Sequence, residues 1–230
     1  MKTLQHTGGI SAILAAATYL FALGLASTLL APMADLSLGF SEYMTFLTAN
    51  QTLIFIWHFT MYIINGICLV FLALSLYDRL KDGAPALVQA ATIFGFLWIA
   101  LVFASGLITN YGTVALVNLY PRDPSRAESL KLALETITLG IDSSDKLLGC
   151  LWVGLSSLAA LKTRSLPKAA AILGMLISVM GLIGAAIPAL IAISYAFGVG
   201  VIFWWLWVGI ALLRVPAAAS LPLVRTTQSV

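Results

Sequence analysis

Residues 169–213, AAAILGMLISVMGLIGAAIPALIAISYAFGVGVIFWWLWVGIALL, decide the fold, because these 45 positions contain no charged side chain. A helix needs about 20 apolar residues to cross a bilayer. The run is therefore long enough for two membrane-spanning helices joined by a tight turn. We place that turn near residues 188–194, where Pro188 interrupts the helical pattern.

The composition of the whole chain agrees with this reading. Of its 230 residues, 61% are hydrophobic and only 9% are charged, whereas about 25% are charged in a soluble domain. Open sheets are excluded from the hydrocarbon because their backbone groups would stay unpaired. We predict an all-α fold, a polytopic transmembrane bundle of six helices in a single domain, 1–230. The expected spans are 8–30, 51–76, 85–108, 143–161, 169–188 and 194–213.

Residues 124–139 are too polar to span and are predicted to form an amphipathic interfacial helix between helices 3 and 4. Asp123-Pro124 has the pattern of an N-cap followed by proline at the first helical position. Apolar residues then recur at helical spacing opposite charged ones, as in a helix lying on a membrane surface. Gly140 is expected to end this helix before the fourth span begins.

Basic residues predict the orientation. With six spans, one side holds eight of them: Lys2, Arg79, Lys81, Lys162, Arg164, Lys168, Arg214 and Arg225. The other side holds four: Arg122, Arg126, Lys131 and Lys146. The positive-inside rule then places both termini in the cytoplasm of a cell membrane, such as a bacterial inner membrane. The net charge of +3 carries this orientation signal and does not indicate nucleic-acid binding.

The chain shows none of the sequence motifs for metal, nucleotide or nucleophilic chemistry. It has no HExxH, GxSxG, P-loop or CxxCH motif. Cys68 and Cys150 both lie in apolar runs and are expected to be buried free thiols. We therefore expect no cofactor, and the type of activity, if any, stays open.

Charged residues stand beside the fourth span in the stretch Asp142-Ser143-Ser144-Asp145-Lys146. One interpretation is a helix start, with Asp142 as N-cap and Asp145 three residues later in a capping-box position. The other is an ionisable cluster at the mouth of a ligand cavity. The first interpretation needs no compensation, because charge at a helix end costs much less than charge at mid-membrane.

A second polar set lies in the second span, where His58, Tyr62 and Asn65 are spaced i, i+4 and i+7. That spacing places all three on one face of an α-helix. Such a stripe faces protein or a water-filled cavity rather than acyl chains. It either forms hydrogen bonds between helices or lines a ligand site, and the sequence leaves both open.

An internal echo links two spans. Leu151-Trp152-Val153-Gly154-Leu155 recurs as Leu206-Trp207-Val208-Gly209-Ile210. Both copies would run in the same direction across the membrane, which indicates a parallel repeat unless apolar composition produces the match by chance.

A family resemblance rests on Ser165-Leu166-Pro167-Lys168 followed by Gly174 and Gly181 on an apolar helix. With a glycine-rich, tryptophan-bearing span before it, this layout resembles a bacterial family of six-span membrane proteins known only as a domain of unknown function. The resemblance covers roughly residues 41–190. It implies the six-span fold but no activity and no site.

Three functional hypotheses follow. The first is a small-molecule binding or transport module with an outward-facing polar pocket. The second is a membrane-embedded enzyme on a lipophilic substrate, with Asp145 or His58 as acid or base. The third is a subunit that assembles with copies of itself or a membrane partner through a small-residue face formed by Gly174, Ser178, Gly181 and Ala185. The candidate ligand-binding residues are His58, Tyr62, Asn65, Asp142, Asp145 and Lys146.

Overall fold

A computed structural model describes residues 2–35, 37–187 and 190–214, and throughout these residues the chain is helical without strands. Six helices in it are long and apolar enough to cross a membrane, which confirms the all-α multi-pass bundle. The elements are α1 (Lys2–Ser27), η1 (Ala31–Ala34), α2 (Phe40–Ala49), α3 (Gln51–His58), η2 (Phe59–Ile64), α4 (Asn65–Leu80), α5 (Pro85–Leu119), α6 (Pro124–Thr163), α7 (Lys168–Ala186) and α8 (Ile191–Leu213). Pro188 and Arg225 lie outside the described residues.

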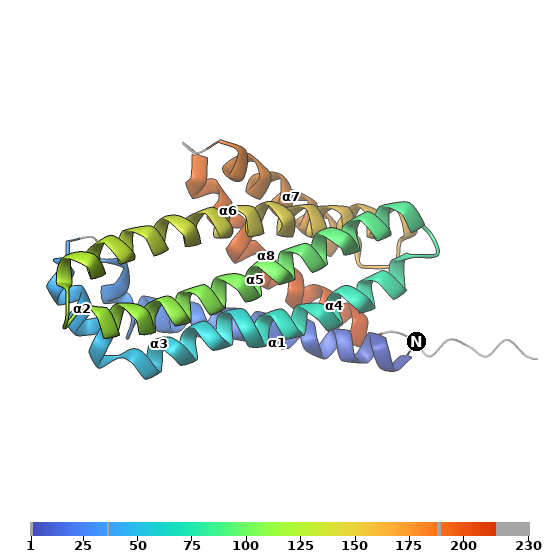
Figure 1. The fold of residues 1–230 in the computed structure, drawn as a ribbon. Helices are drawn as coiled ribbons and strands as arrows, with labels where there is room; N and C mark the ends of the chain where they lie inside the picture. Colours follow the sequence, from blue (N-terminus) through green and yellow to red (C-terminus); the bar gives the residue numbers. More distant parts are fainter. Residues whose placement is uncertain (1, 36, 188–189, 215–230) are drawn as a thin grey trace, which may run out of the picture.

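The six long elements form a closed ring. The helices α4, α5, α6, α7 and α8 each pack on the next one along the chain, and α8 closes the ring against α1, which also packs on α4. The start of α1, the α4–α5 turn and the α6–α7 turn gather at one end (Figure 1). We call this the basic end and the opposite one, which carries α2, the distal end.

Two of the helices are much longer than a bilayer requires. With 35 and 40 residues, α5 and α6 extend about 50 and 60 Å, against a hydrocarbon core of about 30 Å. At the distal end they pack with α2 and α3 around a small second core, whose buried residues are Leu30, Met44, Leu47, Ile54 and Leu116. The α5–α6 hairpin therefore projects beyond the membrane-length part of the ring.

This hairpin corrects two predictions. There is no separate interfacial helix at 124–139, because α6 continues unbroken through Gly140 to Thr163. A glycine inside a helix costs only about 1 kcal/mol relative to alanine, and packing of α6 along α5 offsets that cost. The helix α5 also runs on to Leu119, beyond the predicted end of the third span at 108, and α1 ends at Ser27.

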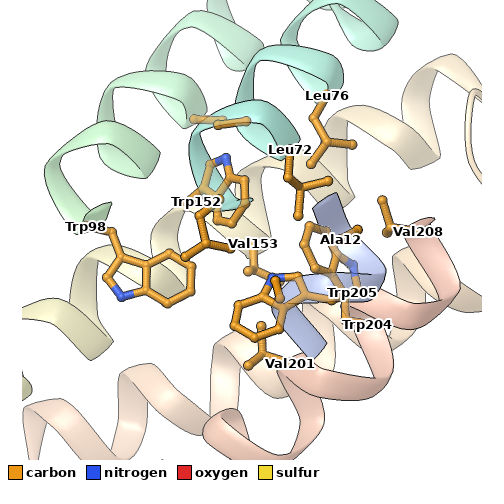
Figure 2. Packing of buried hydrophobic residues seen from close by; sticks show 14 of the residues in the cluster. Ala12, Leu72, Leu76, Trp98, Trp152, Val153, Val201, Trp204, Trp205 and Val208 are labelled. Atoms are coloured by element: carbon orange, nitrogen blue, oxygen red, sulfur yellow. The ribbon is translucent and has the colours of Figure 1, made fainter. Parts of the chain in front are cut away.

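Four tryptophans pack close together among the buried residues of the ring (Figure 2). Trp98 on α5 and Trp152 on α6 lie with ring centroids 5.5 Å apart, and each sits over a glycine of the other helix. A Cβ atom at Gly95 would come within 2.7 Å of the Trp152 ring, and one at Gly149 within 2.8 Å of the Trp98 ring. Trp204 and Trp205 on α8 complete the cluster and are fully buried.

The structure also describes the two cysteines and the two copies of the internal echo. Cys68 and Cys150 are buried free thiols, as expected. The two copies of the internal echo differ in environment, because Trp152 is buried whereas Trp207 is 42% exposed. The echo therefore does not correspond to equivalent packing.

Candidate functional site

A cavity of about 360 Å³ lies between α1, the α3–η2 segment, α6 and the beginning of α8. Its size falls in the usual range of small-molecule sites, about 300–1,000 Å³. The residues that line it are Tyr19, Ala22, Leu23, Ala26, Trp57, Met61, Tyr62, Trp98, Asp142, Asp145, Lys146, Phe197, Gly198, Val199 and Val201.

All charged residues of this cavity lining come from α6. Asp142, Asp145 and Lys146 lie at i, i+3 and i+4, a spacing that places them on one helix face. Lys146 interacts electrostatically with both carboxylates. From α5, the Ser105 hydroxyl donates to Asp142 Oδ1 over 3.0 Å, which orients this carboxylate.

The helix-start interpretation of this cluster is wrong. Asp142 lies near the middle of α6, about 18 residues after its first residue, Pro124. The cap of α6 is Asp123, whose carboxylate accepts a hydrogen bond from the Arg126 backbone N–H over 3.1 Å. Asp142, Asp145 and Lys146 thus fill no capping role, and their side chains face the cavity.

Aromatic rings make up much of the remaining wall, and they come from every surrounding element except α6. Tyr19 comes from α1, Trp57 and Tyr62 from the α3–η2 segment, and Phe197 from α8. Trp98 belongs both to this lining and to the tryptophan cluster, since its ring contacts Trp152, Phe197 and Trp205. The tryptophan cluster therefore forms the floor of the cavity on the side of the basic end.

The cavity opens between α1 and α8. Leu23 and Val199 line it and are also 47% and 51% exposed, respectively. Counted from the basic ends of their helices, Leu23 is about 30 Å away, Asp145 about 27 Å and Val199 about 21 Å at 1.5 Å per residue. The cavity therefore lies roughly 20–30 Å from the basic end, and its mouth lies in the farther half of the two shorter helices α1 and α8.

The three residues of the predicted polar stripe, His58, Tyr62 and Asn65, do not share one environment. His58 Nδ1 lies 3.2 Å from Asn110 Oδ1 on α5, and His58 is not among the cavity residues. Asn65 Nδ2 donates to the Ala15 carbonyl and the Thr18 hydroxyl on α1, over 3.0 and 2.9 Å. Of the three residues, Tyr62 alone is among the residues that line the cavity.

The reason for this split is the π-helical segment Phe59–Ile64. A π turn contains more residues than an α turn, so the α-helical spacing that aligns His58, Tyr62 and Asn65 does not hold across it. Such bulges occur frequently at functional sites. The sequence pattern around residues 59–64 does not predict this π-helical segment.

Sequence reasoning missed Tyr19, Trp57, Trp98, Phe197 and Ser105. A partial signal was present, because Gly95-x-x-Trp98 and Gly149-x-x-Trp152 share a spacing that the structure converts into reciprocal packing. The other aromatics stand on different helices, and a sequence does not show which depths coincide.

The fold and cavity define a class: a multi-pass helical membrane protein with a charged, aromatic-walled cavity inside the bundle. No protein-family model matches this chain, and neither does any curated protein sequence or solved structure. The resemblance to a six-span family of unknown function therefore stays a prediction.

Proposed function

We propose that the protein binds a small amphiphilic organic cation in the cavity between α1, α6 and α8. The observation that carries the proposal is the pair Asp142 and Asp145 facing an aromatic wall. With all three charged groups ionised, two carboxylates and the Lys146 ammonium leave one net negative charge. Aromatic faces attract cations as well, by up to about 2 kcal/mol when desolvated. A cationic head with an apolar body matches both parts of the lining.

The position of the mouth supports an amphiphilic ligand. Leu23 and Val199 stand on the outer surfaces of membrane-length helices. A ligand dissolved in the bilayer reaches the cavity there without crossing the ring. Its head would then meet Asp145 while its apolar part contacts the tryptophan and tyrosine rings.

Binding is favoured over the other hypotheses by particular contacts. For transport, the tryptophan cluster blocks a continuous path toward the basic end in this conformation. For an enzyme, the two acid/base candidates are separated, since Asp145 faces the cavity and His58 pairs with Asn110. For assembly, the small-residue face of α7 is used within the chain: Gly174 packs on Ser157 and Trp204, and Gly181 on Cys150 and Phe197.

We also propose that the cavity opens in the outer half of the membrane. The support is the excess of basic residues at the basic end, which the positive-inside rule assigns to the cytoplasm. A membrane-impermeant thiol reagent should then label a cysteine placed at Ser129 from outside but not one placed at Asp82. The reverse pattern would invert the orientation.

The test of binding uses two probes of the same shape and opposite charge. Tetraphenylphosphonium and tetraphenylborate are titrated into the protein in lipid nanodiscs, with empty nanodiscs as background. We expect saturable binding of the cation and none of the anion. The Asp145→Asn variant should bind the cation about tenfold more weakly, which corresponds to about 1.4 kcal/mol.

The matched control is Glu128→Gln on the same helix, an exposed carboxylate outside this cavity. It should leave cation binding unchanged. Equal binding of both probes, or equal weakening by both variants, would show that the cavity does not select a cation. In that case the proposed function is wrong.

A further inference from the structure

A second pocket, of about 390 Å³, lies at the basic end between α4, the α6–α7 turn and α8. It is separate from the cavity that Asp142 and Asp145 line, and the two share no residue. The residues that line it are Arg79, Arg164, Ser165, Leu166, Pro167, Trp207, Ile210, Ala211 and Arg214.

Three different elements bring their arginines to this pocket. Arg79, near the end of α4, donates from Nε and Nη2 to the Ser165 carbonyl, each over 3.2 Å. Arg164 ends α6 in the left-handed region with φ 53°, a conformation uncommon for residues other than glycine. Arg214 follows α8 as its C-cap. The arginine positions therefore depend on the tertiary fold rather than on one sequence segment.

The pocket is strongly positive. Its described lining contains three guanidinium groups and no carboxylate. The nearest acidic residue along α4, Asp78, forms an ion pair of 2.7 Å with Lys81 and accepts a hydrogen bond from Gln5. The Asp78 carboxylate thus pairs with Lys81 and Gln5 and is not among the residues that line the pocket. Guanidinium groups match the geometry of phosphate oxygens.

One wall of the pocket continues onto the outer surface of α8. Trp207 and Ile210 line the pocket and are 42% and 40% exposed. Phe203, one turn farther into the membrane, is 58% exposed on the same helix face. An apolar strip thus leads from the arginines along the lipid-facing side of α8. Tryptophan at such a position is typical of the headgroup level of a bilayer.

We infer that this arginine pocket binds the phosphate headgroup of an anionic phospholipid, with an acyl chain along Phe203, Trp207 and Ile210. Basic pockets between transmembrane helices are a recognised form of anionic-lipid site. A free phosphate would account for the arginines but not for the apolar strip. The strip therefore favours a lipid as the source of the phosphate group.

The experiment measures lipid retention by native mass spectrometry of the full chain. Dioleoylphosphatidylglycerol and dioleoylphosphatidylcholine have the same acyl chains and compete for the wild-type protein in equal amounts. We expect a preference of at least about fivefold for the anionic lipid. Millimolar inorganic phosphate should not displace it. Equal retention of the two lipids, or full displacement by phosphate, overturns the inference, the latter in favour of free phosphate.

A variant locates the site. The double change Arg164→Gln with Arg214→Gln should lower retention of phosphatidylglycerol about tenfold. The matched control, Arg122→Gln with Arg126→Gln, removes the same charge at the distal end and should leave retention unchanged. Equal loss in both variants would indicate general charge attraction and overturn the site. If the first variant does not fold, the lipid competition on the wild-type protein still decides.

Discussion

Tyr62 and Asn65 are three residues apart on one membrane-spanning segment, yet the structure uses them in different ways. Asn65 is fully buried, and its amide donates two hydrogen bonds to α1. Tyr62 lines the cavity that also holds Asp145. His58, four residues before Tyr62, is buried and paired with Asn110. Of these three polar residues in one span, His58 and Asn65 thus form hydrogen bonds to neighbouring helices, whereas Tyr62 lines the cavity.

The difference shows what separates a packing residue from a cavity residue in a membrane protein. A polar side chain without water must find a partner, and when a neighbouring helix supplies that partner the residue stabilises the fold. A polar side chain that faces a cavity keeps its capacity for a ligand. Three variants along this segment separate the two roles, from the largest expected effect on stability to the smallest.

Asn65→Leu should have the largest effect. It removes two buried hydrogen bonds and leaves the Thr18 hydroxyl without this neighbour, so we expect a loss of about 1–2 kcal/mol in the free energy of unfolding. Thermal unfolding in mild detergent measures it. Asn118→Leu, the same change at an exposed position of α5, should cost far less. Cation binding should be unchanged; a strong loss of binding by a protein that still folds would place Asn65 in the site.

His58→Leu should have an intermediate effect. It removes one side-chain hydrogen bond to Asn110 while roughly keeping the volume, so we expect a loss of about 0.6 kcal/mol. Unfolding in detergent gives the value, with His6→Leu, an exposed histidine on α1, as control. Because His58 lies outside the cavity, the affinity for tetraphenylphosphonium should stay within about twofold of wild type. A tenfold drop in this affinity would show that His58 contributes to ligand binding.

Tyr62→Phe should have the smallest effect on stability, under about 0.5 kcal/mol. The hydroxyl is lost, but the ring remains against Gly106 and still presents an aromatic face to a cation. We therefore expect an affinity change of about two- to threefold, much less than for Asp145→Asn. Tyr111→Phe, at a 74% exposed position, serves as control. A large loss of stability would show that Tyr62 is a packing residue like Asn65.

The sequence predicted part of the candidate site. Asp142, Asp145, Lys146 and Tyr62 were candidates, and the structure brings all four to one cavity. His58 and Asn65 were candidates on helical spacing alone, and the π-helical segment between them made that spacing misleading. The aromatic wall was not predicted, because Tyr19, Trp98 and Phe197 come from three helices whose relative depths depend on packing.

The sequence by itself determined the class of the fold. Apolar runs of membrane length leave no other way to satisfy the backbone than helices, so six spans and their order follow from composition and the positions of charged turns. The tertiary structure alone decided where the long helices end and what their polar residues do. Gly140 could break a helix in isolation, but α6 continues through it because α5 packs alongside. Whether a carboxylate caps a helix or faces a cavity depends on that continuation and on the neighbouring helices, which local sequence does not contain.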